Sequence, residues 1–310
     1  MLRVIPFEFR KLFEQPMIYL FFISCLLLNT IYIATAGLDQ SYLNYIQEME
    51  VKTGNLITSE FRDKLSNQSA SKKQRLLTET AVLENVFQHY STEALGQEMI
   101  DFFQIQGSVA EKMKEKYERL TSVVHELAEE QAALEVGAAG ETMSFFTFIR
   151  NRLFRVILGE SLIFALLLGL YGSTSERLTK TDVLVITSKT GRKTQVSKYV
   201  ASLILTFLFY VTMVILTFGI FNHMHPVGVL WETSMSTQFH LNVYVPQSLE
   251  IPFIPWQPMT LLNYTILSIV LGGLLIILCH GFNFLVGLWT DHLFRGFIVF
   301  IVIDVVFLGM

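Results

Sequence analysis

Charged side chains are missing from three long stretches of this 310-residue sequence. No Asp, Glu, Lys or Arg occurs in residues 15–38, 199–231 or 251–290, and charged residues make up only 16% of the whole chain. Soluble globular proteins carry about a quarter charged residues. Because uncharged apolar runs of about 18 residues or more are typical of membrane-spanning helices, the pattern excludes a soluble globular protein. It predicts an all-α, polytopic membrane protein.

Cysteine and the common catalytic motifs are also scarce. The two cysteines, Cys25 and Cys279, lie inside apolar runs, so no disulfide framework is expected. The sequence contains no GxxxxGKS/T, HExxH, CxxC or GxSxG motif, and KTGRKT at 189–194 lacks the first glycine of a P-loop. His223 and His225 are more typical of a polar membrane edge than of a metal site. We therefore predict no enzyme activity in this chain, and no catalytic, cofactor-binding or metal-ligating residues.

Proline is absent from residues 38–149, the largest polar region of the chain. This region carries 18 Asp and Glu residues against 10 Lys and Arg residues. Within it, residues 76–90 and 109–134 place apolar side chains near one helical stripe. The pattern predicts a helical domain with two long helices and several shorter ones. The net charge of the whole chain, −4, is too small to indicate a nucleic-acid partner.

These features divide the chain into membrane spans and the segments between them. The predicted segments are an interfacial cytoplasmic helix at 1–16, a first span at 17–37, an extracytoplasmic helical domain at 38–149, a second span at 150–172, a cytoplasmic basic loop at 173–198, a third span at 199–221, a proline-rich extracytoplasmic segment at 222–258, a fourth span at 259–290 and a short fifth span at 294–310. As one helix the fourth span would measure about 48 Å, longer than a hydrocarbon core of about 30 Å. We expect it to tilt, to break at one of its glycines or to project beyond the membrane. The short fifth span suggests truncation, so the protein has five or six transmembrane helices.

Positive charge is distributed unequally between the two sides of these spans. With the N-terminus and the basic loop on one side, that side has ten Lys and Arg residues near the spans and the other has about four. By the positive-inside rule, the N-terminus and the loop are cytoplasmic. Arg150, Arg152 and Arg155 argue against this orientation and are expected to meet lipid headgroups at the outer surface. We predict a multi-pass protein of a bacterial plasma membrane.

A few polar residues interrupt the apolar spans, where each is costly in lipid. They are Asn29, Glu160, Asn263, His280, Asn283 and Asp304. One interpretation makes Glu160, Asn29, Asn263, Asn283 and Asp304 the lining of a translocation route or a proton relay. The other is hydrogen bonding between helices, or a position shallow enough to reach the headgroups. The residues are too sparse for a typical ion-coupled carrier, and no repeat relates the two halves of the chain.

The basic loop carries the most specific pattern in the sequence, SERLTKTDVLVITSKTGRKTQVSKY at 175–199. It resembles the stretch after the second span in ABC-2-type permeases, the membrane subunits of type V ABC exporters. The features that match are Glu176, Thr179 or Thr181, Leu184, the turn TSKTGRK, and Lys198 at the opening of the next helix. The order of segments also resembles that family. Two departures are the count of five spans where the family has six, and Gly191 where the family has a proline near the arginine.

The resemblance implies an exporter driven by a separate ATPase. Two copies of an ATP-binding cassette subunit would bind ATP and Mg²⁺, while this chain binds no cofactor of its own. The residues expected to contact that subunit are Glu176, Arg177, Val183, Leu184, Val185, Ile186, Lys189, Arg192 and Lys193. A second permease half, the same chain or a related one, would complete the transporter in the lipid bilayer. An amphipathic substrate such as a peptide, antibiotic or lipid is implied, with a role in antibiotic resistance.

Two other functions remain open. A membrane sensor or scaffold would bind a ligand through the helical domain and have no ATPase partner, although five spans are more than such a protein needs. A membrane enzyme acting on lipids would need a cluster of His, Asp or Ser at one membrane face, and the sequence shows none.

Overall fold

The computed structural model is predominantly helical in the residues that it describes. These residues are 4–66, 70–81, 83–138, 140–181, 185, 187, 191–239 and 253–290. They contain no β-strand, only two isolated bridges, Leu56–Glu135 and Ser234–Thr260, so the predicted all-α fold class is confirmed. The chain forms two compact units. Unit 1 comprises Met1–Ala36, Asn151–Met224 and Leu267–Met310, and unit 2 comprises Gly37–Arg150 and His225–Ile266.

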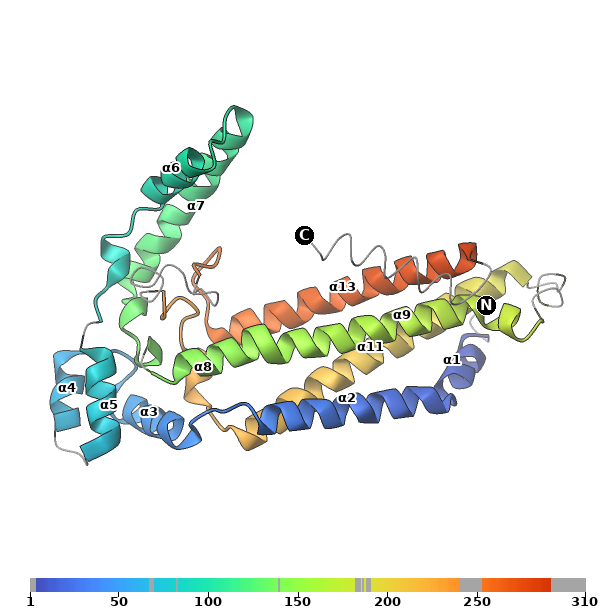
Figure 1. Cartoon of the computed structure of the whole chain (residues 1–310), viewed down its shortest axis with the longest axis horizontal. Coiled ribbons are helices and arrows are strands. Elements are labelled where there is room, and N and C mark those ends of the chain that lie inside the picture. Colours follow the sequence, from blue (N-terminus) through green and yellow to red (C-terminus); the bar gives the residue numbers. More distant parts are fainter. Residues whose placement is uncertain are drawn as a thin grey trace. The chain divides into compact units, whose positions relative to one another are not determined.

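Unit 1 contains the long apolar helices (Figure 1). Its elements are α1 (Ile5–Phe13), α2 (Pro16–Ala34), α9 (Phe154–Leu178), α11 (Gly191–Met224) and most of α13 (Leu261–Trp289). Among the described residues, four helical stretches are long and apolar enough to cross a membrane: Pro16–Ala34, Thr142–Leu178, Lys193–Met224 and Leu261–Trp289. They indicate a membrane protein, as predicted. The predicted fifth span, 294–310, lies outside the described residues.

Aromatic rings hold α2, α9 and α11 together in unit 1. Phe164 of α9 stacks on Phe209 of α11, with ring centroids 3.9 Å apart. Phe21 of α2 lies 5.8 Å from both rings, and Phe22 packs edge-on to Phe209 at 6.0 Å. Lipid tails are as apolar as these side chains, so close packing and dispersion, not exclusion of water, stabilise such contacts in a membrane.

Glycines allow α13 to approach its neighbours closely. A Cβ atom added to Gly272 would lie 2.9 Å from the Tyr210 hydroxyl oxygen, and one added to Gly169 of α9 would lie 2.9 Å from Cβ of Asn283. The Tyr210 hydroxyl donates a 2.6 Å hydrogen bond to the Ile269 carbonyl oxygen. Small residues at helix contacts are the usual device of membrane helix packing. Of the three alternatives expected for this span, a break does not occur: α13 is continuous over Leu261–Trp289, and its glycines serve these contacts.

Helices α9 and α11 extend beyond their predicted ends. The sequence predicts a basic loop over 173–198, but α9 continues to Leu178 and α11 already begins at Gly191. Glu176 and Arg177 at the end of α9, and Gln195 and Lys198 at the start of α11, have partners on neighbouring helices, which stabilises these extra turns. At the other end of α9, a short π-helix, Phe148–Leu153, joins it to α8 (Thr142–Thr147).

Unit 2 contains shorter amphipathic helices. They are α3 (Gln40–Thr53), α4 (Ser59–Ser66), α5 (Ala70–Thr80), α6 (Thr92–Phe102), α7 (Ser108–Glu129), α8, and the 3₁₀ segments η1 (Val86–Gln88), η2 (Ala132–Leu134), η3 (Val136–Ala138) and η5 (Val229–Glu232). The predicted stripe at 76–90 is not one helix. The Arg62 guanidinium donates a 3.0 Å bond to the Thr80 carbonyl oxygen, and the Asn85 amide donates a 2.8 Å bond to the Ala128 carbonyl oxygen. These contacts between elements replace the helical bonds that would continue α5.

An ionic network ties three parts of unit 2 together. The Arg75 guanidinium of α5 lies 3.2 Å from Asp39, 2.9 Å from Glu79 and 3.2 Å from Glu141. It also lies over the Tyr42 ring, 4.0 Å from the ring centroid, and the Tyr42 hydroxyl donates to Glu79. Burial, reinforced by Glu79, raises the pKa of Tyr42. Because several charges share one guanidinium, this network contributes more than a single surface pair would.

Candidate functional site

A buried ion pair joins α9 to α11 at the two ends of the basic loop. The Lys198 ammonium of α11 lies 2.5 Å from the Glu176 carboxylate of α9, and their side chains are only 2% and 9% exposed. Gln195 donates a 3.3 Å bond to the same carboxylate, and the ammonium donates a 3.4 Å bond to the Ser175 hydroxyl. A buried charge that loses its partner is strongly unfavourable, so this pair fixes the relative position of the two helix ends.

The next residue of α9 ties in a third helix. The Arg177 guanidinium donates 2.5 Å and 2.9 Å bonds to the carbonyl oxygens of Thr290 and Leu288, at the C-terminal end of α13. The last carbonyls of a helix have no partner within the helix and carry its negative dipole end, so a cation there is stabilising. Through Glu176 and Arg177, consecutive residues of α9 therefore hold the ends of α11 and α13.

The loop between these fixed ends is shorter than predicted. Helix α9 ends at Leu178 and α11 begins at Gly191, and between them Lys180 has a left-handed backbone with φ 56°. Val185 is half-buried and donates a helical-type bond to the Thr181 carbonyl oxygen at 3.1 Å. Among the other predicted contact residues, Lys193 is exposed on the first turn of α11. Val183, Leu184, Ile186 and Lys189 lie outside the described residues, as does the side chain of Arg192.

Two of the predicted polar residues meet in the middle of unit 1. The Asn29 amide of α2 donates a 3.0 Å bond to the Glu160 carboxylate of α9 and a 3.1 Å bond to the Thr217 hydroxyl of α11. Asn29 is fully buried. This geometry favours the interpretation of hydrogen bonding between helices, since one amide ties three helices together.

The remaining polar residues of the spans do not join this cluster. His280 of α13 is buried, with its two ring nitrogens 3.0 Å and 3.1 Å from the hydroxyls of Ser202 and Thr206. Asn283 is buried, and neither polar atom of its amide has a hydrogen-bond partner in the part of the chain that the structure describes. Asn263 is exposed in the first turn of α13, and Asp304 lies outside the described residues. The predicted translocation residues thus do not form one polar path among the described residues.

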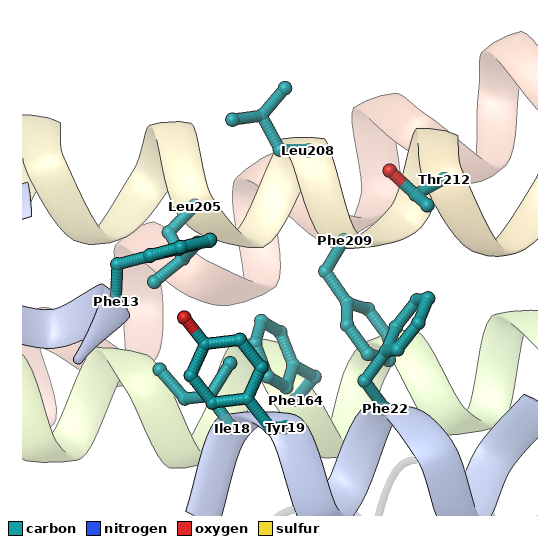
Figure 2. A pocket seen from close by; sticks show the side chains of 9 residues that line it. All are labelled: Phe13, Ile18, Tyr19, Phe22, Phe164, Leu205, Leu208, Phe209 and Thr212. Atoms are coloured by element: carbon teal, nitrogen blue, oxygen red, sulfur yellow. The ribbon is translucent and has the colours of Figure 1, made fainter. Parts of the chain in front are cut away.

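Two apolar cavities flank the contact between α2 and α9. The cavity in Figure 2 has a volume of about 310 Å³ and is lined by α1, α2, α9 and α11. Figure 2 shows Tyr19, Phe22 and Phe209 around it, with Thr212 as a polar group at one end. The second cavity, about 410 Å³, lies between α2 and α9, and both are bordered by Phe164. Their apolar walls suit lipid chains or an amphipathic molecule.

The sequence left Lys198 and Gln195 out of the predicted site, although one signal pointed to Lys198. It shares a helical stripe with Ala201 and Leu205, both of which are buried. A lysine on the apolar face of a helix needs a buried partner, and Glu176 is that partner. Thr217, which joins the Asn29 cluster, gave no comparable signal, because a threonine in an apolar span is common.

Comparison with known proteins adds no relative. No family model, no curated protein and no solved structure matches this chain.

Proposed function

We propose that this chain is the membrane-spanning permease subunit of an ABC exporter, in which a separate chain hydrolyses ATP and an amphipathic substrate is moved. The main support is the connection at the ends of the basic loop. Glu176 and Arg177, the last polar residues of α9, hold α11 through Lys198 and α13 through its final carbonyls. A partner that moved the loop would therefore move three spans as one body.

The same connections define how a force on the loop would spread. Helix α1 packs against α11, and Phe13 at its end borders the same cavity as Leu205 of α11. A displacement of α11 would shift α1 and alter the apolar cavities beside α2. Rigid-body movement of packed helices about an interface is an established form of switching. Glu176 and Arg177 would act by holding the helix ends, whereas the exposed Lys193 would meet the partner directly.

Affinity purification of the whole chain in mild detergent tests the proposal. We expect a P-loop ATPase to purify with it, and we expect the double reversal Arg192→Glu and Lys193→Glu to weaken that association severalfold, because charge pairs of this kind determine specificity. The matched control reverses two exposed lysines of α7, Lys112→Glu and Lys114→Glu, and should leave the association intact. Recovery of the chain with no ATPase, or equal loss in both variants, would contradict the proposal.

A membrane sensor or scaffold is the second candidate. Unit 2 favours it because this unit has its own hydrophobic core, built around Phe87, Leu127 and Phe239, and could bind a ligand by itself. The sensor interpretation predicts that the chain purifies without an ATPase, so the same purification separates the two candidates.

A further inference from the structure

Unit 2 contains a cavity with an acidic lining. Its volume is about 290 Å³. The residues that line it are Glu50, Asn55, Glu135, Val229, Glu232 and Thr233. Three of these six are glutamates, and none is a lysine or arginine. Among the described residues, the wall therefore concentrates acidic groups and contains no positive side chain.

Two deeply buried side chains in this wall lack hydrogen-bond partners. Glu50 is only 8% exposed, and its carboxylate oxygen Oε2 has no hydrogen-bond partner among the described residues. Thr233 is 4% exposed, and within the same described ranges its hydroxyl has no partner either. Buried polar atoms in folded proteins are nearly always satisfied, and leaving them unpaired costs free energy. Both residues line the same cavity, so a group bound there would be close to both of them.

The backbone holds these side chains in fixed positions. Glu50 lies in the last turn of α3. Glu135 is placed by the short antiparallel contact in which Val136 N–H donates 2.7 Å to the Asn55 carbonyl and Ile57 N–H donates 2.8 Å to the Leu134 carbonyl. The Ser234 N–H then donates a 2.7 Å bond to the Glu135 carboxylate. Two of the three glutamates, Glu50 and Glu135, are thus held by the scaffold, whereas Glu232 lies at the exposed rim.

The crowding of carboxylates changes their titration. Burial, reinforced by the nearby Glu232, raises the pKa of Glu50 to about 7. Burial also raises the pKa of Glu135 to about 7; Glu50 and Glu130 add to this, and the Ser234 N–H opposes it. Both groups carry protons part of the time near neutral pH. A cation in the cavity would favour their ionised forms, so its binding would release protons.

We propose that this acidic cavity of unit 2 is a binding site for an organic cation, an ammonium or guanidinium group carried by a small molecule or a peptide. Among the described residues, no three Asp, Glu, His or Cys side chains converge closely enough to hold a metal ion. The volume instead suits a larger cation, and carboxylates bind guanidinium groups through paired hydrogen bonds. The site goes beyond the exporter proposal and holds whether or not an ATPase partner exists.

Calorimetric titration of the purified full-length chain with agmatine, which carries both a guanidinium and an amine, tests this site. We expect Glu50→Gln to weaken binding about tenfold or more, since it removes the most buried carboxylate that would pair with the cation. The matched control is Glu48→Gln on the same helix, an exposed residue whose loss removes the same charge and should leave binding unchanged. Binding to the unaltered chain should weaken as the pH falls from 8 to 6, by up to about tenfold per proton per pH unit.

Glu50→Gln should also fold well. Because the pKa of Glu50 is raised in the folded chain, this carboxyl stabilises the fold below about pH 4 and loses that contribution as the pH rises through about 7. The unaltered chain is therefore less stable at pH 8. The Glu50→Gln variant, which cannot ionise there, should have the higher melting temperature at that pH. If Glu50→Gln nevertheless fails to fold, Glu232→Gln at the exposed rim provides the same binding test. Undetectable agmatine binding, equal binding by Glu50→Gln and the unaltered chain, or tight Ca²⁺ binding that excludes agmatine would overturn the assignment.

Discussion

Replacing Lys198 by methionine isolates the contribution of the buried ion pair. Methionine fills a similar volume but leaves the Glu176 carboxylate, 9% exposed, with the 3.3 Å bond from Gln195 as its one side-chain partner within the described part of the chain. Breaking a buried pair by removing one partner costs about 3–5 kcal/mol. At about 2 °C per kcal/mol for a chain of this size, Lys198→Met should lower the melting temperature by roughly 6–10 °C.

A double-mutant cycle separates the pair from its surroundings. Glu176→Leu alone leaves the ammonium of Lys198 with the 3.4 Å bond to Ser175, so it should cost a similar amount. The double variant leaves no buried charge, and replacing a whole pair by apolar residues is often nearly neutral, so it should lie within about 1 kcal/mol of the unaltered chain. The cycle should therefore give a coupling energy of several kcal/mol.

The two native cysteines provide the assay. Cys25 is 4% exposed in α2, whereas Cys279 of α13 is half-buried, so the labelling of Cys25 by a thiol-reactive fluorophore reports the opening of unit 1 as the detergent-solubilised chain is heated. Lys193→Met, an exposed change of the same kind on α11, is the control and should melt with the unaltered chain. If the losses in stability of the two single variants simply add in the double variant, Lys198 and Glu176 do not stabilise the helix ends as a pair. The pair would then not transmit a movement of the loop to α11.

Two further substitutions test the packing of each unit. Gly272→Ala places a methyl group against the Tyr210 hydroxyl and should lower the stability of unit 1 by about 1–3 kcal/mol, measured in the same thiol assay. The control is Gly219→Ala, whose added Cβ meets no described atom within 4 Å and should cause no comparable loss. Arg75→Ala removes three ion pairs and a ring contact and should destabilise unit 2 by about 1–2 kcal/mol, less at high salt, as followed by circular dichroism on heating. Arg119→Ala breaks one exposed pair and should change stability by under about 0.5 kcal/mol; equal losses would show that the Arg75 network adds nothing.

Local chemistry made much of the fold predictable. Uncharged runs give helices in the structure, and Pro16 occupies the first position of α2, where its missing N–H costs nothing. The 3.0 Å bond from Asn29 to Glu160 fits the interpretation of hydrogen bonding between helices, one of the two given for these residues. Each of these inferences follows from the residue types within one apolar segment.

The rest depended on partners that a linear pattern does not reveal. The turns of α9 and α11 beyond their predicted ends are polar, and their sequence by itself predicts a loop. They are helical in the structure because Glu176 and Lys198 neutralise one another. Gly272 suggests a weak point in α13, but its missing side chain is what admits Tyr210. Glu50 lies seven residues after the buried Leu43, on the same face of the helix. This spacing predicts that Glu50 is buried.

The bond between Asn29 and Glu160 has a consequence for how the protein is made. The two residues are 131 positions apart, so at about 5–20 residues per second the ribosome completes Glu160 roughly 7–26 s after Asn29. During that interval α2 lies in the bilayer, and the Asn29 amide lacks Glu160 as a partner because α9 has not yet been synthesised. The newly inserted helix must therefore persist as a lone anchor, which its nineteen uncharged residues permit, and assembly of the bundle begins only when α9 follows it out of the translocon.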